Sequence, residues 1–455
     1  MGANRGFGSR FGHIMALAGF CIGIGNMWKF PYMVGANGGG LFLIIYIIGV
    51  IVVGLPLFIL EQQLGRSSQL SGIAGMKKLA PKNKTLWSIL IGWVGLITII
   101  MIACYFWSIL GWNIGYIVKV TDGSMFGLGT EAVTQSFVDF SGSWFCVLAA
   151  AVSAIMCWLM MGTDFQKGVE KLCKIAMPVL IILMIGLAIY SASLPGAFAG
   201  LKWYFKPVAE GLDVMAVIQA AVVQVFFSIG IGMSCAYVYG SYVTKDANMI
   251  GHSVGAAAMD TIVAILSGLV ITPALFAFGI EPTAGPGLVF ISLPQLFTAM
   301  GNVPGRIFGF LFLFAVFLAC ITSMAAVLES LVTNMSDRFG WSRKTGRNVM
   351  IGITFGISII VTLNQGSGPL AGGWFFGYDL FSLLDMLASG FGLTLGAIFM
   401  VVYIIVGKRF DWFREEVNQG AGKLRIGKWM KWYYYIVLPI ILAFVFYCIL
   451  HMYFG

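Results

Sequence analysis

Residues 19–26 read GFCIGIGN, and they interrupt an apolar stretch that runs from residue 10 to residue 33. A second interruption, FFSIGIG at residues 226–232, lies inside the apolar stretch 214–242. At membrane depth, irregular backbone is tolerated only where protein or a water-filled cavity satisfies its polar groups. One such run of glycines could simply allow close helix packing. Two runs at matching positions, each with a polar side chain, predict two broken helices that meet near the middle of the bilayer.

The composition places the rest of the chain in the membrane as well. Of the 455 residues, 59% are hydrophobic and only 10% are charged, whereas soluble domains carry about 25% charged residues. A helical span needs roughly 20 apolar residues, and the ten-residue alternation of a membrane β-barrel is absent. We therefore predict an all-α integral membrane protein. Its eleven expected transmembrane helices lie near 10–33, 41–66, 87–119, 144–161, 170–193, 214–242, 252–279, 305–334, 348–364, 380–406 and 433–454.

The two breaks also predict the organisation of the chain. Each broken helix opens a block of five spans, at 10–193 and at 214–406. Because five is odd, the second block enters the membrane from the side opposite to the first. Two blocks related in this way are inverted repeats. We expect one transporter domain over residues 1–455, with 433–454 as an additional eleventh helix.

The positive charge of the chain follows the predicted topology. The net charge is +9. With the N-terminus in the cytoplasm, all but five of the 27 basic residues fall on the cytoplasmic side, as the positive-inside rule requires. The charge therefore indicates no nucleic-acid partner. We expect a multi-pass protein of the inner (plasma) membrane with its C-terminus outside. The five exceptions are Lys29, Lys119, Lys202, Lys206 and Arg306.

A few polar residues in the apolar spans could hold a cation. Asn26 closes the first break, Ser228 lies in the second, and Asp260 is within the seventh span. A membrane carboxylate is costly unless a cation or a hydrogen-bond donor meets it, so Asp260 is either an ion ligand or a hydrogen-bonded structural residue. Thr322 and Ser323 lie in the middle of the eighth span. The chain has no HExxH, GxSxG or phosphate-loop motif, and its three histidines are far apart, so we expect no enzyme activity.

Several motifs carry a resemblance to a known family. They are GNMWKFPYMVGANGGGLFLIIY (25–46), EQQLGR (61–66), QVFFSIGIGM (224–233), YGSYVTKDANM (239–249), MDTIVAILSG (259–268) and CITS (320–323). Over about residues 5–450 the chain resembles the neurotransmitter:sodium symporter family, in particular its prokaryotic branch. The resemblance implies a leucine-transporter-type fold that carries a small amino acid with sodium by alternating access.

The resemblance also implies two sodium sites and a substrate pocket. The first sodium site would use the Cys21 carbonyl with Asn26, Ser228 and Asp260. The second would use carbonyls of Gly19, Ile22 and Ala319 with the hydroxyls of Thr322 and Ser323. The substrate would be lined by Ile22, Gly23, Gly25, Tyr105, Phe106, Phe227, Ser228, Gly230, Ile231, Met233, Ser323 and Val327.

The chain departs from the family pattern at several of these positions. Phe106 stands where the family usually has the tyrosine that bonds the substrate carboxylate. Either Tyr105 supplies that hydroxyl, or the contact is missing. Asp260 stands where many relatives have asparagine, so its charge should strengthen cation binding or allow a proton to matter. Ala264 offers no hydroxyl for chloride, and we expect no chloride requirement.

The implied gates differ from the family as well. The outer gate would pair Lys29 with Asp385, and lysine cannot form the bidentate contact of arginine. The inner gate would use Tyr242 and Asp337, with Arg5 beside the position of the usual arginine.

Together these features predict a sodium-coupled symporter of neutral, bulky hydrophobic amino acids. The implied side-chain pocket is apolar and holds no acid or fixed base, and burying an unpaired charge there would cost several kcal/mol. A proton-coupled or exchange carrier of the same fold, or a transport-dead amino acid sensor, are the alternatives. The expected partners are a small amino acid and membrane lipid, and the expected state is a monomer or weak homodimer.

Overall fold

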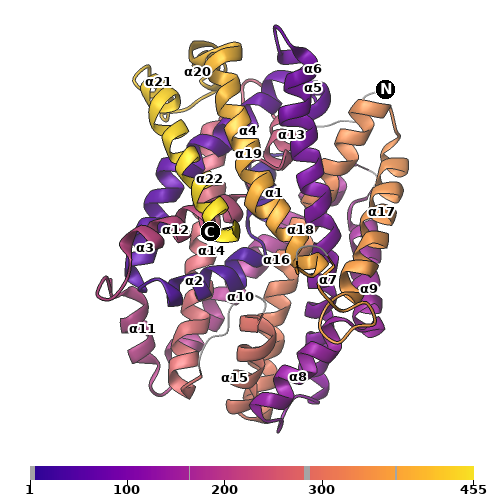
Figure 1. Ribbon diagram of the computed structural model, residues 1–455, viewed down its shortest axis with the longest axis vertical. Helices are drawn as coiled ribbons and strands as arrows, with labels where there is room; N and C mark the ends of the chain where they lie inside the picture. Colours follow the sequence, from indigo (N-terminus) through magenta and orange to yellow (C-terminus); the bar gives the residue numbers. More distant parts are fainter. Residues whose placement is uncertain (1–5, 163, 281–286, 375–376, 455) are drawn as a thin grey trace.

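The computed structural model describes residues 6–162, 164–280, 287–374 and 377–454, which form a bundle of helices (Figure 1). No strand occurs within these residues, and an isolated bridge pairs Gly39 with Pro207. Eight of the described helices are long and apolar enough to cross a membrane, and ten are if each of two bent pairs counts as one span. The prediction of an all-α membrane bundle is confirmed, whereas the number of eleven spans stays a prediction.

The helices that form the bundle are, in chain order, α1 (Arg10–Cys21), α2 (Phe30–Ala36), α3 (Gly40–Gly49), α4 (Leu55–Ser68), α6 (Lys84–Trp87), α7 (Val94–Asp122), α9 (Trp144–Met160), α10 (Lys171–Ala192), α12 (Val214–Ile229), α13 (Cys235–Ser241), α14 (Met249–Phe278), α16 (Asn302–Phe339), α17 (Arg343–Leu363), α18 (Leu380–Asp385), α19 (Leu393–Val402), α21 (Met430–Trp432) and α22 (Leu438–Phe454). The connecting helices are α5 (Gly72–Leu79), α8 (Thr130–Ser141), α11 (Ala197–Phe205), α15 (Leu293–Ala299) and α20 (Phe410–Val417). Wider π turns occupy Gly25–Lys29, Val50–Gly54, Ser88–Trp93, Gln166–Glu170, Leu288–Ser292, Met386–Gly392, Tyr403–Lys408 and Tyr433–Val437.

Two helices are broken within the stretches that the sequence singles out. The first span ends as α1 at Cys21 and resumes at Gly25 with a bend of 60°. In the sixth span, α12 ends at Ile229, and α13 starts only at Cys235. Gly230 and Gly232 have φ of 66° and 88°, a region that glycine enters without steric cost. The relation of spans 1–5 to spans 6–10 as inverted repeats stays a prediction.

Side chains from neighbouring spans satisfy the backbone at both breaks. Glu61 of α4 is 1% exposed, and its Oε2 accepts a hydrogen bond of 2.8 Å from the Gly232 amide. At the first break, the Ser267 hydroxyl donates to the Asn26 carbonyl at 2.6 Å. The broken helices thus exist because the surrounding spans supply the partners that the interrupted helices lack.

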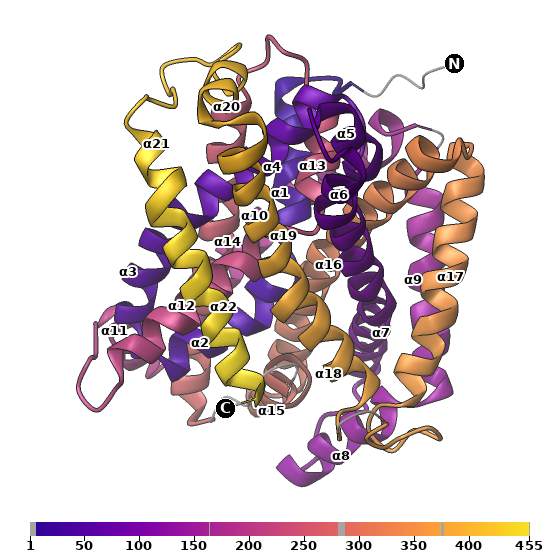
Figure 2. The same cartoon turned by 45° about the horizontal axis from the view of Figure 1, so that its top comes forward.

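The two ends of the bundle carry different connections. Helices α5, α6, α20 and α21 gather at one end, and α8, α11 and α15 at the other (Figures 1 and 2). The basic segments 77–84 and 408–431 belong to the first end. This grouping is the one that the positive-inside rule describes, and the orientation of the bundle in a membrane stays a prediction.

The three glycines of the NGGG motif allow two chain segments to touch. The Gly40 amide donates to the Lys206 carbonyl, and the Val208 amide donates to the Gly38 carbonyl, both at 3.1 Å. A Cβ atom on any of Gly38, Gly39 or Gly40 would collide with the backbone of residues 203–208. The end of α2 is therefore joined directly to the segment that leads into α12.

The buried contact of Glu61 predicts its contribution to stability. We expect Glu61→Ala to destabilise the protein by about 1.5–3 kcal/mol, because hydrogen bonds to charged groups are worth that much and the Gly232 amide would lose its acceptor. The readout is the midpoint of thermal unfolding of the purified protein in detergent. Glu415→Ala is the matched control, since the Glu415 side chain is 71% exposed and its loss should leave the midpoint unchanged. A wild-type midpoint for Glu61→Ala would contradict this role.

Candidate functional site

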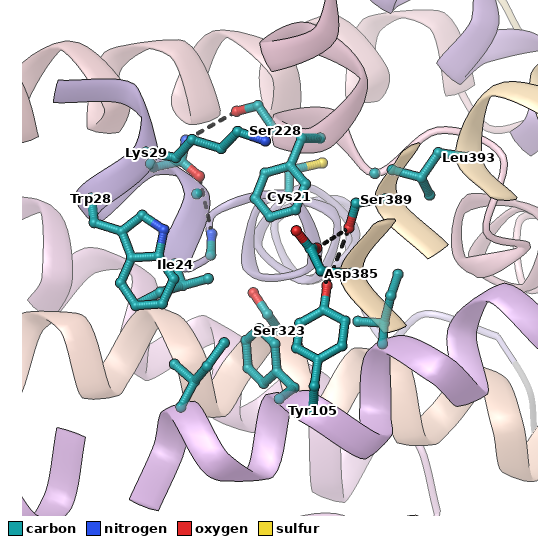
Figure 3. Close-up of a pocket in the computed structure, with 18 of the residues that line it drawn as sticks. Cys21, Ile24, Trp28, Lys29, Tyr105, Ser228, Ser323, Asp385, Ser389 and Leu393 are labelled. Carbon is teal, nitrogen blue, oxygen red and sulfur yellow. Dashed lines mark hydrogen bonds between the residues drawn. The ribbon is translucent and has the colours of Figure 1, made fainter. Parts of the chain in front are cut away.

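A cavity of about 270 Å³ lies where the two broken helices meet α7, α16 and the tenth span (Figure 3). Of the residues implied as substrate contacts, all except Ile22 and Ile231 line it. Those that do are Gly23, Gly25, Tyr105, Phe106, Phe227, Ser228, Gly230, Met233, Ser323 and Val327.

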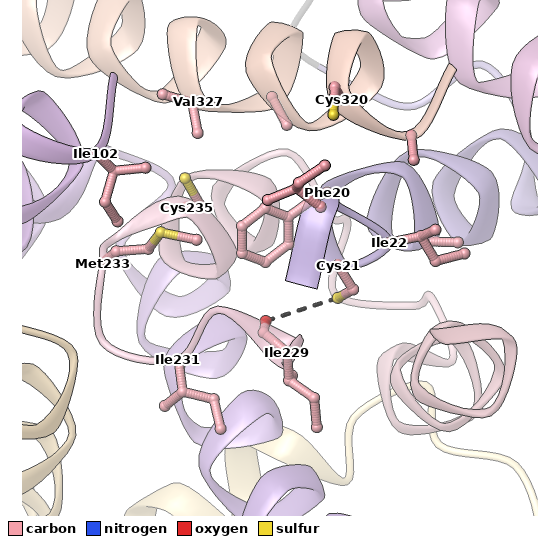
Figure 4. Close-up of a cluster of buried hydrophobic side chains, with 14 of the residues drawn as sticks. Phe20, Cys21, Ile22, Ile102, Ile229, Ile231, Met233, Cys235, Cys320 and Val327 are labelled. Carbon is pink, nitrogen blue, oxygen red and sulfur yellow. Dashed lines mark hydrogen bonds between the residues drawn. The ribbon is translucent and has the colours of Figure 1, made fainter. Parts of the chain in front are cut away.

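The two exceptions are fully buried and belong to the packing around the cavity. Ile231 lies in an apolar cluster with Cys21 and Ile229 (Figure 4), while Ile22 offers its carbonyl to another side chain. Sequence reasoning did not identify Ile102 and Ile109, which also line the cavity. They stand four residues before and three residues after Phe106, so the helical spacing around Phe106 would have pointed to them.

A first cluster of oxygen atoms lies beside the cavity, between the two breaks. The Ser228 hydroxyl donates to Asp260 Oδ2 at 2.7 Å, and the Asn26 amide donates to Asp260 Oδ1 at 2.8 Å. Asn26 Oδ1 in turn accepts from the Gly23 amide at 3.1 Å. The structure therefore brings together Asn26, Ser228 and Asp260, and Cys21 lines the adjoining part of the cavity.

Tyr46 completes this cluster and was missed by sequence reasoning. Its hydroxyl donates to the Ser228 hydroxyl at 3.1 Å and lies 3.5 Å from Asp260 Oδ2. A tyrosine in the apolar stretch 41–66 carries no sequence signal of its own, because aromatic residues are ordinary in membrane spans.

A second cluster of oxygen atoms lies between α1 and α16. The Ser323 hydroxyl lies 3.1 Å from the Gly19 carbonyl and 2.9 Å from the Ile22 carbonyl. The Thr322 hydroxyl lies 3.1 Å from the Ala319 carbonyl, and Thr322 Cβ is 3.4 Å from where a Cβ on Gly19 would stand. All five residues implied for this site are thus brought together.

Both clusters suit a cation bound by oxygen. One Ser323 proton faces two carbonyl oxygens, so a single hydroxyl hydrogen bond cannot fully satisfy both. Unwound backbone carbonyls of broken helices are the ligands that sodium uses in transporters of this construction. In the first cluster, Asp260 adds a carboxylate to hydroxyl and amide oxygens, and Asp260 is fully buried. The donor sets therefore fit sodium in both places.

At the end of the cavity that we expect to face outside, Lys29 and Asp385 both face the interior but have different partners. The Lys29 ammonium lies 4.3 Å from the centroid of the Phe227 ring. Asp385 Oδ1 accepts hydrogen bonds from the hydroxyls of Tyr105 at 3.0 Å and Ser389 at 2.6 Å (Figure 3). These two described side chains form no ion pair with each other. The Tyr105 hydroxyl is thus engaged by Asp385, and Phe106 presents only its ring to the cavity.

At the opposite end, one of the expected inner-gate residues, Tyr242, contacts a buried ion pair. Tyr242 donates to Glu329 Oε1 at 2.8 Å, and Arg343 binds both Glu329 oxygens at 2.7 Å. Asp337 accepts from the Ser71 amide at 2.8 Å, and Arg5 lies outside the described residues. Glu329 was missed, although the reasoning applied to Asp260 would have found this second carboxylate in a span.

Comparisons with known proteins identify the family of this chain. The family model described as the sodium:neurotransmitter symporter family matches residues 5–127 and 129–454. The sodium-dependent transporter YhdH of Bacillus subtilis (strain 168) is 32% identical over 441 residues, which cover 96% of each chain. The sodium- and chloride-dependent GABA transporter 2 of Homo sapiens is 26% identical over 451 residues, 87% of this chain and 72% of that protein.

A solved structure agrees as well. The crystal structure of MhsT in complex with L-phenylalanine is 30% identical and matches with a TM-score of 0.84, over 98% of this chain and 99% of that chain. The resemblance seen in the sequence motifs is thereby confirmed over nearly the whole length. This multi-pass chain therefore belongs to the sodium:neurotransmitter symporter family, and it is a sodium-coupled transporter of a small molecule.

Proposed function

We propose that the protein is a symporter that moves neutral, bulky hydrophobic amino acids together with sodium by alternating access. The observation that carries this proposal is the cavity between the two broken helices, with one oxygen cluster on either side of the first break. A sodium ion among Cys21, Asn26, Ser228 and Asp260 and a second among Gly19, Ile22, Ala319, Thr322 and Ser323 are the proposed co-substrates.

The placement of the clusters gives a physical reason for coupling. Asn26 and Ser228 belong to the two broken helices, whereas Asp260 belongs to α14. A cation held among them would fix both breaks in one arrangement and would stand beside the cavity, its charge balanced by Asp260. The carboxylate of an amino acid would be attracted to that charge and to the free amides of the first break. Because Ala264 provides no hydroxyl, Asp260 supplies the negative charge, and we propose that chloride is not required.

The lining of the cavity supports a hydrophobic side chain as the transported group. Phe20, Ile102, Phe227, Met233 and Val327 enclose it. Its charged members are Lys29 and Asp385, which do not contact each other. We assign these two to the outer gate rather than to the side-chain pocket. MhsT, the solved relative, binds L-phenylalanine, which supports an aromatic or large aliphatic substrate here.

The different contacts at the two ends of the cavity support a mechanism of alternating access. The inner end is held by the Glu329–Arg343 pair with Tyr242. At the outer end Lys29 is separated from Asp385, which is bound by Tyr105 and Ser389. We propose that Lys29 meets Asp385 when the outer side closes, and that Tyr242, Asp337 and Arg5 guard the inner side.

Transport should require sodium and be independent of chloride. In proteoliposomes, uptake of labelled leucine should follow an inward sodium gradient and persist when gluconate replaces chloride. Uptake that continues at the same rate with choline in place of sodium would overturn the proposal, and would favour a proton-coupled or exchange carrier. Binding of leucine without any uptake would indicate a sensor.

Replacing Asp260 should weaken sodium binding. We expect Asp260→Ala to raise the half-saturating sodium concentration by roughly 10- to 100-fold, because the loss of a charged ligand costs about 1.5–3 kcal/mol. Asp260→Asn keeps an oxygen, so its half-saturating sodium concentration should lie between those of the wild type and Asp260→Ala. Asp411→Ala is the control, since that carboxylate is 63% exposed. The sodium titration of leucine binding is the readout, and an unchanged curve for Asp260→Ala would remove this residue from the site.

Large hydrophobic amino acids should bind more tightly than small amino acids. A small substrate leaves apolar volume unfilled and forgoes roughly 0.8 kcal/mol for each missing methylene. Unlabelled phenylalanine, methionine and isoleucine should therefore compete with labelled leucine more strongly than alanine or glycine, and lysine and glutamate should not compete. Stronger competition by glycine than by phenylalanine would refute this account of the cavity.

A further inference from the structure

The segment between α20 and α22 carries an exposed group of cations and tryptophans. Its members are Lys423, Arg425, Lys428, Trp429, Lys431 and Trp432, all exposed, which we name the basic–tryptophan turn. Trp429 and Trp432 are 72% and 71% exposed. Two indole side chains so open to their surroundings are typical of the level of the lipid headgroups, where an aromatic ring and a polar N–H are both accommodated.

The segment that carries this turn is fixed to the bundle. The buried Arg66 donates to the carbonyl of Glu416 and, at 3.2 Å, to that of Gln419. Asn418 and Ile426 then exchange two hydrogen bonds of 2.9 Å, one from the Asn418 side-chain amide and one to its oxygen. The loop is therefore preorganised, and a ligand that binds to it loses little conformational entropy of the protein.

The local backbone aligns the two kinds of side chain. The amides of Met430, Lys431 and Trp432 bond the carbonyls three residues earlier, at 3.2, 3.1 and 3.3 Å. Residues three apart eclipse one another in such turns, so the backbone places Lys428 one turn before Lys431 and Trp429 one turn before Trp432. The chain continues from here into the apolar helix Met430–Phe454, which places both pairs where the last span begins (Figure 2).

Three of the cations have no acidic partner among the residues that the structure describes. Lys431 lies 3.8 Å from Asp411, whereas Lys423, Arg425 and Lys428 form no ion pair with any described residue. The positive-inside rule accounts for the side on which these cations stand. It does not account for their being held unpaired on a rigid loop next to two exposed tryptophans.

We propose that the basic–tryptophan turn binds the phosphate headgroup of anionic phospholipids in the adjacent leaflet. In this arrangement the unpaired cations contact the phosphate, and Trp429 and Trp432 rest against the glycerol and upper acyl region. The site is separate from the transport cavity, none of whose lining residues it contains.

The test uses the purified full-length protein in a neutral detergent and a short-chain phosphatidylglycerol as the probe. Binding is followed by the change in tryptophan fluorescence. Short-chain phosphatidylcholine tests the charge of the headgroup, and glycerol 3-phosphate tests a phosphate without acyl chains. The variant Lys423→Gln/Arg425→Gln/Lys428→Gln removes the three cations. Lys82→Gln/Lys84→Gln/Lys344→Gln removes three exposed charges elsewhere at the same end of the bundle and is the matched control.

We expect the wild type and the control to bind phosphatidylglycerol alike, and the turn variant to bind it at least about tenfold more weakly. Each basic residue near an anionic surface strengthens binding by roughly fivefold. Equal binding by the turn variant, or an equal loss in the control, would overturn the proposal. Equal affinity for phosphatidylcholine would also overturn it, because the charge of the headgroup would then not be recognised. Equal affinity for glycerol 3-phosphate would overturn it as well, because the acyl chains would then have no role.

Discussion

The need to satisfy backbone polar groups inside a membrane governs this structure. Each break leaves amides and carbonyls without partners in their own helix, and no water is available in the hydrocarbon to bond them. The chain meets this need with buried side chains from three other spans, of which Glu61 at Gly232 and Ser267 at Asn26 are the clearest. The positions of α4 and α14 around the centre follow from the contacts that these side chains make.

The same requirement explains why the proposed ion sites lie at the breaks. The Gly19 and Ile22 carbonyls share one Ser323 proton, and Asp260 collects donors from Asn26, Ser228 and Tyr46. Each cluster holds together through its own hydrogen bonds and keeps more acceptor capacity than the protein's donors fill. Because of this excess of acceptors, the folded state would gain free energy if a cation bound at either cluster.

The sequence was informative where a residue type is costly in a membrane. Glycine pairs and the apolar stretches predicted the membrane bundle and its two breaks, and the carboxylate of Asp260 pointed to the centre of the bundle. The residues that line the cavity were implied by the resemblance to the family. Tyr46 escaped because a tyrosine in a span is unremarkable, and the bond between Tyr105 and Asp385 escaped because it depends on how α7 faces α18. Ile231 was assigned to the lining, but the left-handed turns at the flanking glycines direct its side chain into the buried cluster instead.

The backbone contact between residues 38–40 and 206–208 joins the end of α2 to the segment that leads into α12, so one half of each broken helix shares an anchor with the other. A label on one half therefore reports on the other. Gly35 in α2 suits such a label, because a Cβ there would meet nothing within 4 Å. The eight native cysteines are all buried, so a thiol placed at residue 35 would react selectively. The contact between residues 38–40 and 206–208 and the burial of the native cysteines together make this chain well suited to spectroscopic measurements of how this end of the bundle opens.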